Sequence, residues 1–333
     1  MTKDGKTAVT IPVVLAIVLG LVLLAFALPA TNAAPHDVPI GVAGPPPAVE
    51  QLRAQLAQAP EGSFEIHEYA DTAELTEAIE DRDVYGGIAI EQSGPTILTA
   101  PAASPVVAQL LSQLAQQASA QGGSPMPVTE VVSLPDDDAR GAGLAAAMLP
   151  LLLGSIMAAG AGWRAVRAKW AGWAVTLATS VTIGLTVTAI LHALGVFTGS
   201  WWLDAAAIIG VLAATSTAVY GLARVFGLIG IGLGAILLVV VGNPLSGVTS
   251  APELVPEGWS TVGALLPPGA ASQLLRSTAY FDGAGASGRV WVLAGWFAIG
   301  VLLIVLARRG RDVDAELGEE VVHGVDLHAP SRA

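Results

Sequence analysis

The chain has 333 residues, of which 53% are hydrophobic and 13% charged, and its formal net charge is −12 at pH 7. The lack of cysteine excludes disulfides, thiolate metal sites and a cysteine nucleophile. The negative charge argues against a nucleic-acid partner, since phosphate binding needs clustered lysine and arginine.

Six apolar stretches, each about 18–23 residues long, predict a polytopic α-helical membrane protein, because about 20 residues cross a hydrocarbon core of about 30 Å. The stretches are Ile11–Pro29, Ala142–Gly162, Gly172–Leu194, Leu203–Ala223, Gly227–Leu245 and Val290–Ala307. The first, with the preceding tail, forms segment 1–30. A signal peptide ending near Asn32 is the competing interpretation, but the apolar run is longer than such peptides usually carry.

Basic residues predict the orientation of these helices in the lipid bilayer. Nine lysines and arginines fall on one side if both termini are cytoplasmic, as the positive-inside rule requires, and the opposite side has no lysine. They are Lys3, Lys6, Arg164, Arg167, Lys169, Arg224, Arg308, Arg309 and Arg311. The abundance of alanine, glycine and valine with only three lysines favours a bacterial source. We therefore expect a multi-pass protein of the bacterial inner (cytoplasmic) membrane.

The segment 31–140, between the first two spans, is long enough for a soluble domain, which this orientation places outside the cytoplasm. Strand-like segments alternate in it with helix-like ones, which predicts a small α/β (α+β) layer with a mixed sheet. The expected strands are Val38–Ala43, Ser63–Tyr69, Val84–Ile90, Thr96–Thr99 and Val128–Leu134. The expected helices are Ala48–Gln58, Thr72–Asp81 and Val106–Ala120.

Acidic residues dominate this domain, which has sixteen of them against three arginines. The simpler interpretation is a solvated surface that keeps the domain soluble, and the alternative is binding of cationic ligands or divalent ions. Asp136–Asp138 is a weak calcium signal, because it lacks the glycine turn and distal glutamate of an EF-hand. We expect it to mark the point where the chain enters the membrane.

The remaining chain divides into a helical bundle, 141–310, and an acidic C-terminal tail, 311–333, that is expected to be disordered. Within the bundle, the segment 246–289 is too long for a tight connection and too apolar for a free loop. It predicts amphipathic or re-entrant structure at the outer interface, with a short helix over Gln273–Tyr280.

The region from Asn243 to Arg276 carries a family pattern. A small-residue turn is followed by spaced prolines, an aromatic residue, an apolar-proline element and a Leu-Arg pair. The residues are Asn243, Pro244, Pro252, Pro256, Trp259, Pro267, Pro268 and Arg276. In this pattern the chain resembles the membrane (permease) subunits of ABC-2 type exporters. The large insert after the first span is similar to that of the YhgE/Pip (phage infection protein-like) branch, although the opening strand here ends in Ala43-Gly44-Pro45 without that branch's polar residues.

The resemblance implies six spans, a homodimer or heterodimer of permeases, and a separate cytoplasmic ABC ATPase subunit. The residues agree on the last point. A P-loop requires GxxxxGK[ST], and none of the three lysines lies in such a motif. The chain also has no GxSxG elbow. We therefore expect no enzymatic activity, no cofactor and no catalytic or metal site in this chain.

Two groups of residues are candidates for working parts. The basic loop of Arg164, Arg167, Lys169 and Trp170 is expected to dock on the ATPase, the alternative being a plain topology signal. Small residues spaced by four predict close helix contacts, either within one subunit or between two. These are Gly154, Ala158, Gly162, Gly230 and Gly234.

Polar residues near the ends of the spans carry further alternatives. A proton relay of His192 and Asp204 is conceivable, but both are predicted near the interface, which favours ordinary surface placement. Asn243 and Pro244 either line an outer mouth, as part of a gate with the prolines that follow, or simply end a helix.

The sequence thus predicts a permease that exports an amphiphilic or hydrophobic substrate with a partner ATPase. One alternative is a non-transporting envelope receptor or scaffold that displays the acidic domain. The other is a proton-driven secondary transporter.

Overall fold

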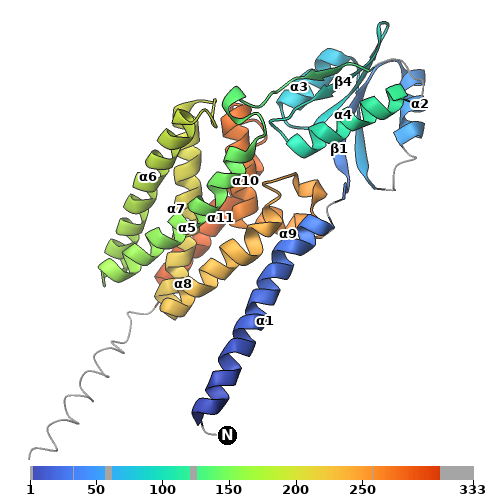
Figure 1. The fold of residues 1–333 in the computed structure, drawn as a ribbon. Coiled ribbons are helices and arrows are strands. Elements are labelled where there is room, and N and C mark those ends of the chain that lie inside the picture. Colours follow the sequence, from blue (N-terminus) through green and yellow to red (C-terminus); the bar gives the residue numbers. More distant parts are fainter. Residues whose placement is uncertain (1–2, 33, 57–61, 121–125, 257, 308–333) are drawn as a thin grey trace, which may run out of the picture.

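The computed structural model describes residues 3–32, 34–56, 62–120, 126–256 and 258–307. It consists of a helical bundle, a soluble domain at one end of the bundle, and an N-terminal helix beside it (Figure 1). We call the end of the bundle that carries the domain the domain end, and the opposite end the far end. The predicted tail, 311–333, lies outside the described residues.

Four helices of the described chain are long and apolar enough to cross a membrane, which indicates an integral membrane protein. They are α5 (Ala142–Ala165), α6 (Lys169–Ala193), α7 (Trp201–Phe226) and α11 (Ser287–Leu306). The central helix is α7, which packs against α5, α6, α8 (Leu228–Ala235) and α11. Its buried face is rich in alanine, serine and threonine, so neighbouring helices approach closely.

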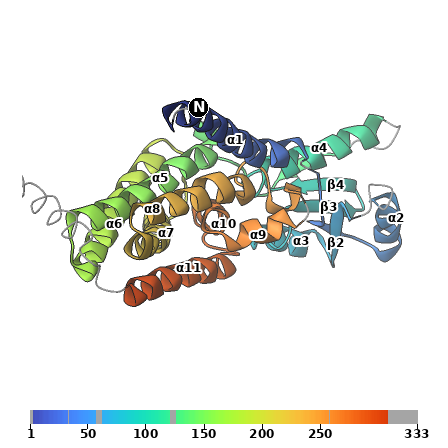
Figure 2. The ribbon, with the colours of Figure 1, turned by 90° about the horizontal axis from the view of Figure 1, so that it is seen from below.

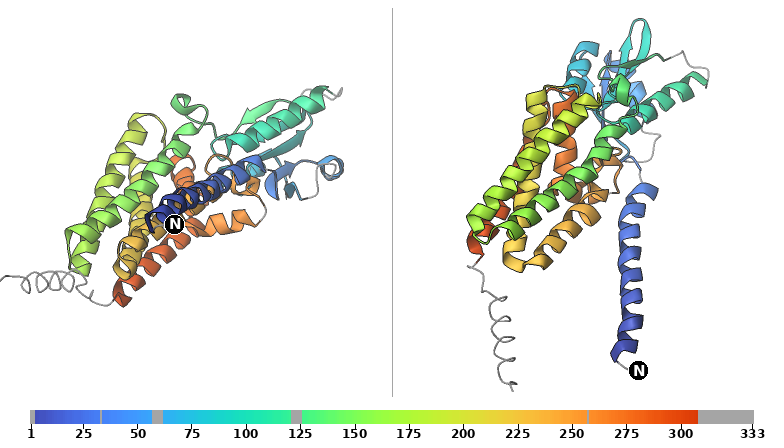
Figure 3. Two further views of the ribbon diagram at one scale, coloured as in Figure 1. Left: turned by 60° about the horizontal axis from the view of Figure 1, so that its bottom comes forward. Right: turned by 60° about the vertical axis from the view of Figure 1, so that its left-hand side comes forward.

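The other two expected spans are shown only in part. The first lies within α1 (Lys3–Thr31), which meets the bundle near its domain end and diverges from it toward the far end (Figures 1 and 3). The fifth is divided into α8, a π-helical turn η2 (Ile236–Gly242) and a 3-10 turn η3 (Pro244–Ser246). The α-helix thus gives way to a π-helix at Ile236, and Pro244, which has no N–H to donate, begins the 3-10 turn that follows. Six spans therefore remain a prediction. Seen from below, α1 and α11 lie at opposite edges of the bundle (Figure 2).

The soluble domain contains a five-stranded mixed sheet in the order β2-β1-β3-β4-β5. Its strands are β1 (Val38–Ala43), β2 (Phe64–Tyr69), β3 (Gly86–Glu91), β4 (Gly94–Thr99) and β5 (Val128–Glu130). Parallel pairs join β1 to β2 and to β3, and β4 to β5, whereas β3 and β4 form an antiparallel hairpin. Every strand predicted from the sequence has a counterpart in this sheet.

The helices of the domain are α2 (Pro46–Leu56), α3 (Thr72–Glu80) and α4 (Pro105–Ala120). Asp71 caps α3, since its Oδ1 accepts from the backbone N–H of Ala73 and of Glu74 at 2.9 Å each. Leu75 and Ile79 on α3 and Leu111 on α4 are fully buried, so these helices hold the sheet between them.

The segment 246–289 forms the surface of the bundle on which the domain packs. Ala251 and Leu254, the latter in η4 (Pro252–Leu254), belong to the core on one side of the domain, and Phe281 belongs to the core on the other. After α9 (Trp259–Leu265), α10 (Pro267–Tyr280) is buried along its length up to Ala279. Pro267 and Pro268 occupy its first positions, where the missing N–H costs nothing.

Candidate functional site at the domain end of the bundle

Arg276 lies in the middle of α10 and binds the soluble domain through backbone oxygens. Its Nη1 donates to the carbonyls of Ala102 at 3.2 Å and Ala103 at 2.8 Å, and its Nη2 donates to that of Val248 at 3.0 Å. The side chain is only 4% exposed. The family pattern included this arginine in an exit segment, and the structure places it at the junction between domain and bundle.

Arg82 makes the reciprocal contact, from the domain into α10. It follows α3 in the left-handed backbone region, with φ of 66°. Its Nη1 donates to the carbonyl of Gln273 at 3.0 Å and to the hydroxyl of Ser277, and its Nη2 donates to Gln273 Oε1 at 2.8 Å. Burial lowers the pKa of Arg82 to about 10, so the guanidinium is still charged at neutral pH. We call Arg82 and Arg276 together the arginine clamp.

A third polar link joins the start of β3 to η4. The Tyr85 hydroxyl donates to Glu253 Oε2 at 2.8 Å. Burial, and next the negative charge of Glu253, raise the pKa of Tyr85 far above its usual value, so the phenol remains a donor. Sequence reasoning missed Arg82, Tyr85 and Glu253. The only available signal was the rarity of arginine in this acidic domain.

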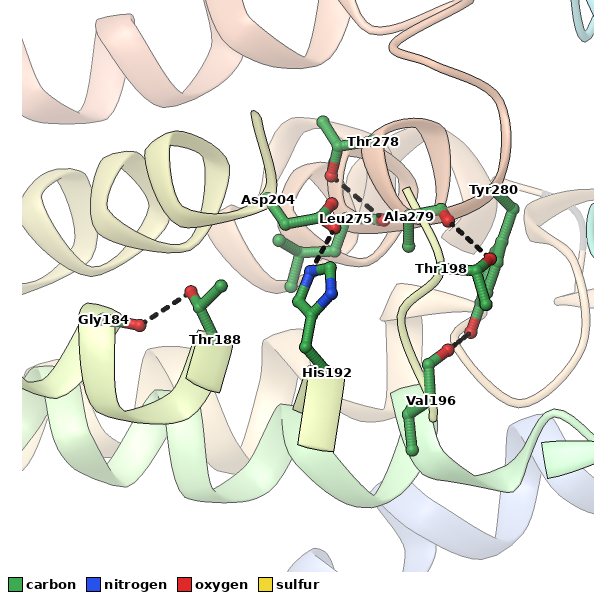
Figure 4. Close-up of polar contacts among 10 residues, drawn as sticks. All are labelled: Gly184, Thr188, His192, Val196, Thr198, Asp204, Leu275, Thr278, Ala279 and Tyr280. Atoms are coloured by element: carbon green, nitrogen blue, oxygen red, sulfur yellow. Dashed lines mark hydrogen bonds and ion pairs between the residues drawn. The ribbon is translucent and has the colours of Figure 1, made fainter. Parts of the chain in front are cut away.

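His192 on α6 and Asp204 on α7 meet inside the bundle, which corrects the expectation of ordinary surface placement (Figure 4). His192 Nε2 lies 2.9 Å from Asp204 Oδ2, and the aspartate side chain is fully buried. Helix α10 covers the pair from the domain side, so closeness to the helix ends did not expose it. Within the described chain, Asp204 Oδ1 has no hydrogen-bond partner.

Helix α10 is also tied to the turn between α6 and α7. The Tyr280 hydroxyl donates to the carbonyl of Val196 at 3.1 Å, and the Thr198 hydroxyl donates to that of Ala279 at 3.4 Å (Figure 4). Helix α10 therefore contacts the domain, α7 and the turn that joins the two helices of His192 and Asp204. A movement of the domain would reach that pair through one rigid element.

The remaining members of the expected gate each begin or precede a helical turn. Pro244 begins η3 after Asn243, Pro252 begins η4, and Pro256 precedes α9, whose first residue is Trp259. These positions favour the helix-terminus interpretation of Asn243 and Pro244.

A cavity of about 700 Å³ lies between α7, α10 and α11. Its wall is mainly apolar, with Gly210 and Ala214 on α7 and Leu293 and Phe297 on α11. Asp282 is among the few polar residues that line it. This volume is typical of small-molecule sites, which are mostly apolar with a few polar groups.

At the far end, hydrogen bonds join the basic loop between α5 and α6 to the ends of two other helices, α7 and α11. Lys169 Nζ donates to the carbonyls of Ile304 and Val305 at 3.2 Å each. The Tyr220 hydroxyl donates to the carbonyl of Lys169 at 2.7 Å, and Arg224 Nη1 donates to that of Arg167 at 3.2 Å. The side chains of Arg164, Arg167 and Trp170 are exposed.

The small residues singled out from the sequence lie at helix contacts within the chain. A Cβ on Gly162 would come within 2.3 Å of the carbonyl of Gly172 on α6. A Cβ on Gly230 would come within 2.1 Å of the carbonyl of Leu222 on α7. Gly154, Ala158 and Gly234 are likewise buried. Their spacing thus reflects packing inside one subunit.

No described part of the chain brings together three or more His, Cys, Asp or Glu side chains that could hold a metal ion. In the Asp136–Asp138 triplet, Asp138 instead caps α5, accepting from Ala142 N at 2.9 Å and Gly143 N at 2.8 Å. Comparison with family models, with curated proteins and with solved structures found no match.

Proposed function

We propose that this chain is the permease subunit of an ABC-2-like exporter, which moves an amphiphilic or hydrophobic substrate outward with the help of a separate ATPase. In this proposal the far end is cytoplasmic, the soluble domain is outside, and two permease chains form the transporter. Two features of the sequence support this proposal: the segment from Asn243 to Arg276 resembles that of ABC-2 permease subunits, and the chain has no P-loop. The apolar cavity beside α7 has the size and chemistry for such a substrate.

The observation that carries the proposal is that the basic loop between α5 and α6 is hydrogen-bonded to α7 and α11. Arg164, Arg167 and Trp170 are exposed for a partner, while the backbone of the same loop holds α7 and Lys169 holds α11. A partner that presses on the loop would move α5, α6, α7 and α11 together. That is the mechanical link through which closure of an ATPase would reach the membrane helices.

The test is a pull-down of the tagged protein from its native membranes in mild detergent. We expect a P-loop ATPase in stoichiometric amount with the wild type, and its loss from the double variant Arg164→Ala/Arg167→Ala. Lys169 is kept in this variant because its hydrogen bonds to the carbonyls of Ile304 and Val305 stabilise the packing of α11. Arg140→Ala, an exposed arginine at the domain end, is the matched control. Equal recovery of an ATPase with the double variant, or none with the wild type, would contradict the proposal.

The buried His192–Asp204 pair favours proton-driven transport as a second candidate function, since ionisable residues within spans often form proton relays. The two candidates differ in energy source. Uptake of a fluorescent alkylamine into inside-out vesicles should require ATP and the Arg164/Arg167 loop if the first is right. It should require an imposed proton gradient, and fail in Asp204→Asn, if the second is right.

A further inference from the structure

Two arginines line a small polar cavity between the domain and the bundle, and a third lies behind its wall. The cavity has a volume of about 100 Å³, and Arg82, Arg289, Tyr85, Gln273 and Glu253 line it. The carbonyl of Ala103, another lining residue, accepts from Arg276, which places the third arginine just behind the wall. Arg289 comes from the first turns of α11, so residues of both the domain and the bundle form the cavity.

These arginines have no close counter-charge, although Glu253 attracts Arg82 from a longer distance. Arg276 is buried, and Arg82 and Arg289 are partly buried. Among the described residues none of the three lies within ion-pair distance of a carboxylate. Buried charges in proteins are normally paired, because taking an ion out of water without a partner is costly. Arg276 also has a buried Nε without a hydrogen-bond partner in the described chain. Glu253 is the one carboxylate on the wall, and its Oε2 already accepts from Tyr85.

The clustering is unusual for this part of the molecule. The soluble domain and the segment that seats it contain five arginines, and acidic residues are in excess there. Three of the five nevertheless meet at one cavity. Burial is the main cause of the lowered pKa of Arg82, and repulsion by Arg276 and Arg289 adds to it. An anion in the cavity would remove that repulsion.

We propose that this cavity binds a phosphate-type oxyanion, supplied by a lipid headgroup or by free phosphate. The guanidinium fork matches phosphate oxygens in pairs, and about 100 Å³ leaves room for one small anion. The place also suits a headgroup, since Arg289 begins α11 and the nearby Trp291 is 77% exposed, as interfacial tryptophans are. The bound anion would join Arg82 of the domain to Arg289 of the bundle. This site is independent of any transport activity.

The first arm of the test uses inorganic phosphate and the purified full-length protein in a neutral, phosphate-free detergent. We expect phosphate to raise Tm more than sodium chloride does at equal ionic strength, because a ligand that binds the folded state stabilises it. Arg289→Gln should abolish the extra shift. Arg289 makes no side-chain hydrogen bond within the described chain, so this variant should fold. Arg140→Gln, with an exposed arginine away from the cavity, is the control.

Glu253→Gln gives a prediction of opposite sign. It keeps an acceptor for Tyr85 but removes the competing negative charge, so it should increase the phosphate-dependent shift in Tm. A merely structural role of the arginines would not produce opposite responses in Arg289→Gln and Glu253→Gln.

The second arm uses nanodiscs that contain phosphatidylglycerol, followed by native mass spectrometry of the released protein. Retention of this lipid by the wild type and Arg140→Gln, but not by Arg289→Gln, identifies a headgroup as the source. A specific phosphate shift without lipid retention identifies the free anion. If phosphate and chloride act alike on the wild type and Arg289→Gln, and lipid retention is equal in both, water fills the cavity and the proposal is wrong.

Discussion

Replacing Arg276 with methionine should loosen the soluble domain without unfolding it. The change removes three hydrogen bonds, to the carbonyls of Ala102, Ala103 and Val248, and leaves those buried oxygens without a donor. At about 1 kcal/mol for each bond, docking should weaken by about 3 kcal/mol. Since 1.4 kcal/mol is tenfold, the undocked population should rise about 100-fold.

Hydrogen exchange measured by mass spectrometry can detect this opening. The backbone N–H of His36 donates to the carbonyl of Glu253 at 2.9 Å, across the junction. Its exchange should therefore accelerate about 100-fold in Arg276→Met if the domain undocks and redocks rapidly. Amides of β3 should keep their protection, because the domain itself stays folded.

Arg53→Met is the matched control for this experiment. Arg53 is paired with Glu68 on the domain surface, where both side chains are about half exposed, and such pairs contribute roughly 0–1 kcal/mol. It should leave the exchange at His36 nearly unchanged. If Arg276→Met folds normally and exchange at His36 matches the wild type, the arginine clamp does not hold the domain in place.

Three further predictions concern other contacts. Above pH 10, wild type should lose stability relative to Tyr85→Phe by up to about 1.4 kcal/mol per pH unit, as measured by chemical denaturation. His192→Ala should lower Tm more than His192→Ala/Asp204→Ala does, because the single change leaves a buried carboxylate alone. Gly162→Ala should lower Tm strongly while Gly160→Ala should not, because a Cβ at position 160 meets nothing within 4 Å.

The sign of the pH effect follows from the direction of the pKa shift. The pKa of Tyr85 is raised in the folded state, so the unfolded chain loses this proton first, near pH 10, and folded stability falls from there. Arg82, with a lowered pKa of about 10, gives the opposite trend at higher pH, but it is present in both proteins and cancels. Equal pH profiles of wild type and Tyr85→Phe would contradict the first prediction. A double variant less stable than His192→Ala would contradict the second. Equal Tm values for the two glycine variants would contradict the third.

The sequence predicted the domain sheet and the four long helices well, because both depend on local patterns. Alternating and continuous apolar runs of residues predicted the strands. The fifth span was less predictable. Its composition is apolar throughout, and no residue pattern marks the change from α-helix to π-helix at Ile236; only the 3-10 turn at Pro244 has a sequence signal.

The polar contacts of the candidate site could not be predicted, because they join residues far apart in the chain. Arg82 and Gln273 are separated by 191 residues and Arg276 and Ala102 by 174, and no local pattern connects them. His192 and Asp204 are only 12 residues apart, yet their burial depends on α10, which comes much later in the sequence. Both residues lie near the helix ends, as the sequence predicted, but the expected surface placement is wrong, because the Asp204 side chain is fully buried in the folded bundle.

The acceptors that Arg276 contacts are all main-chain oxygens, and this has an evolutionary consequence. Such an attachment recognises the path of the backbone and not the identity of the side chains at Ala102, Ala103 and Val248. All three side chains are buried, so packing limits which residues can replace them, but the hydrogen bonds themselves require no particular side chain. The attachment also holds in acidic surroundings, since carbonyls, unlike carboxylates, do not take up protons. Arg276 thus holds the insert through its backbone, so residues on the exposed surface of the insert can change without altering this attachment.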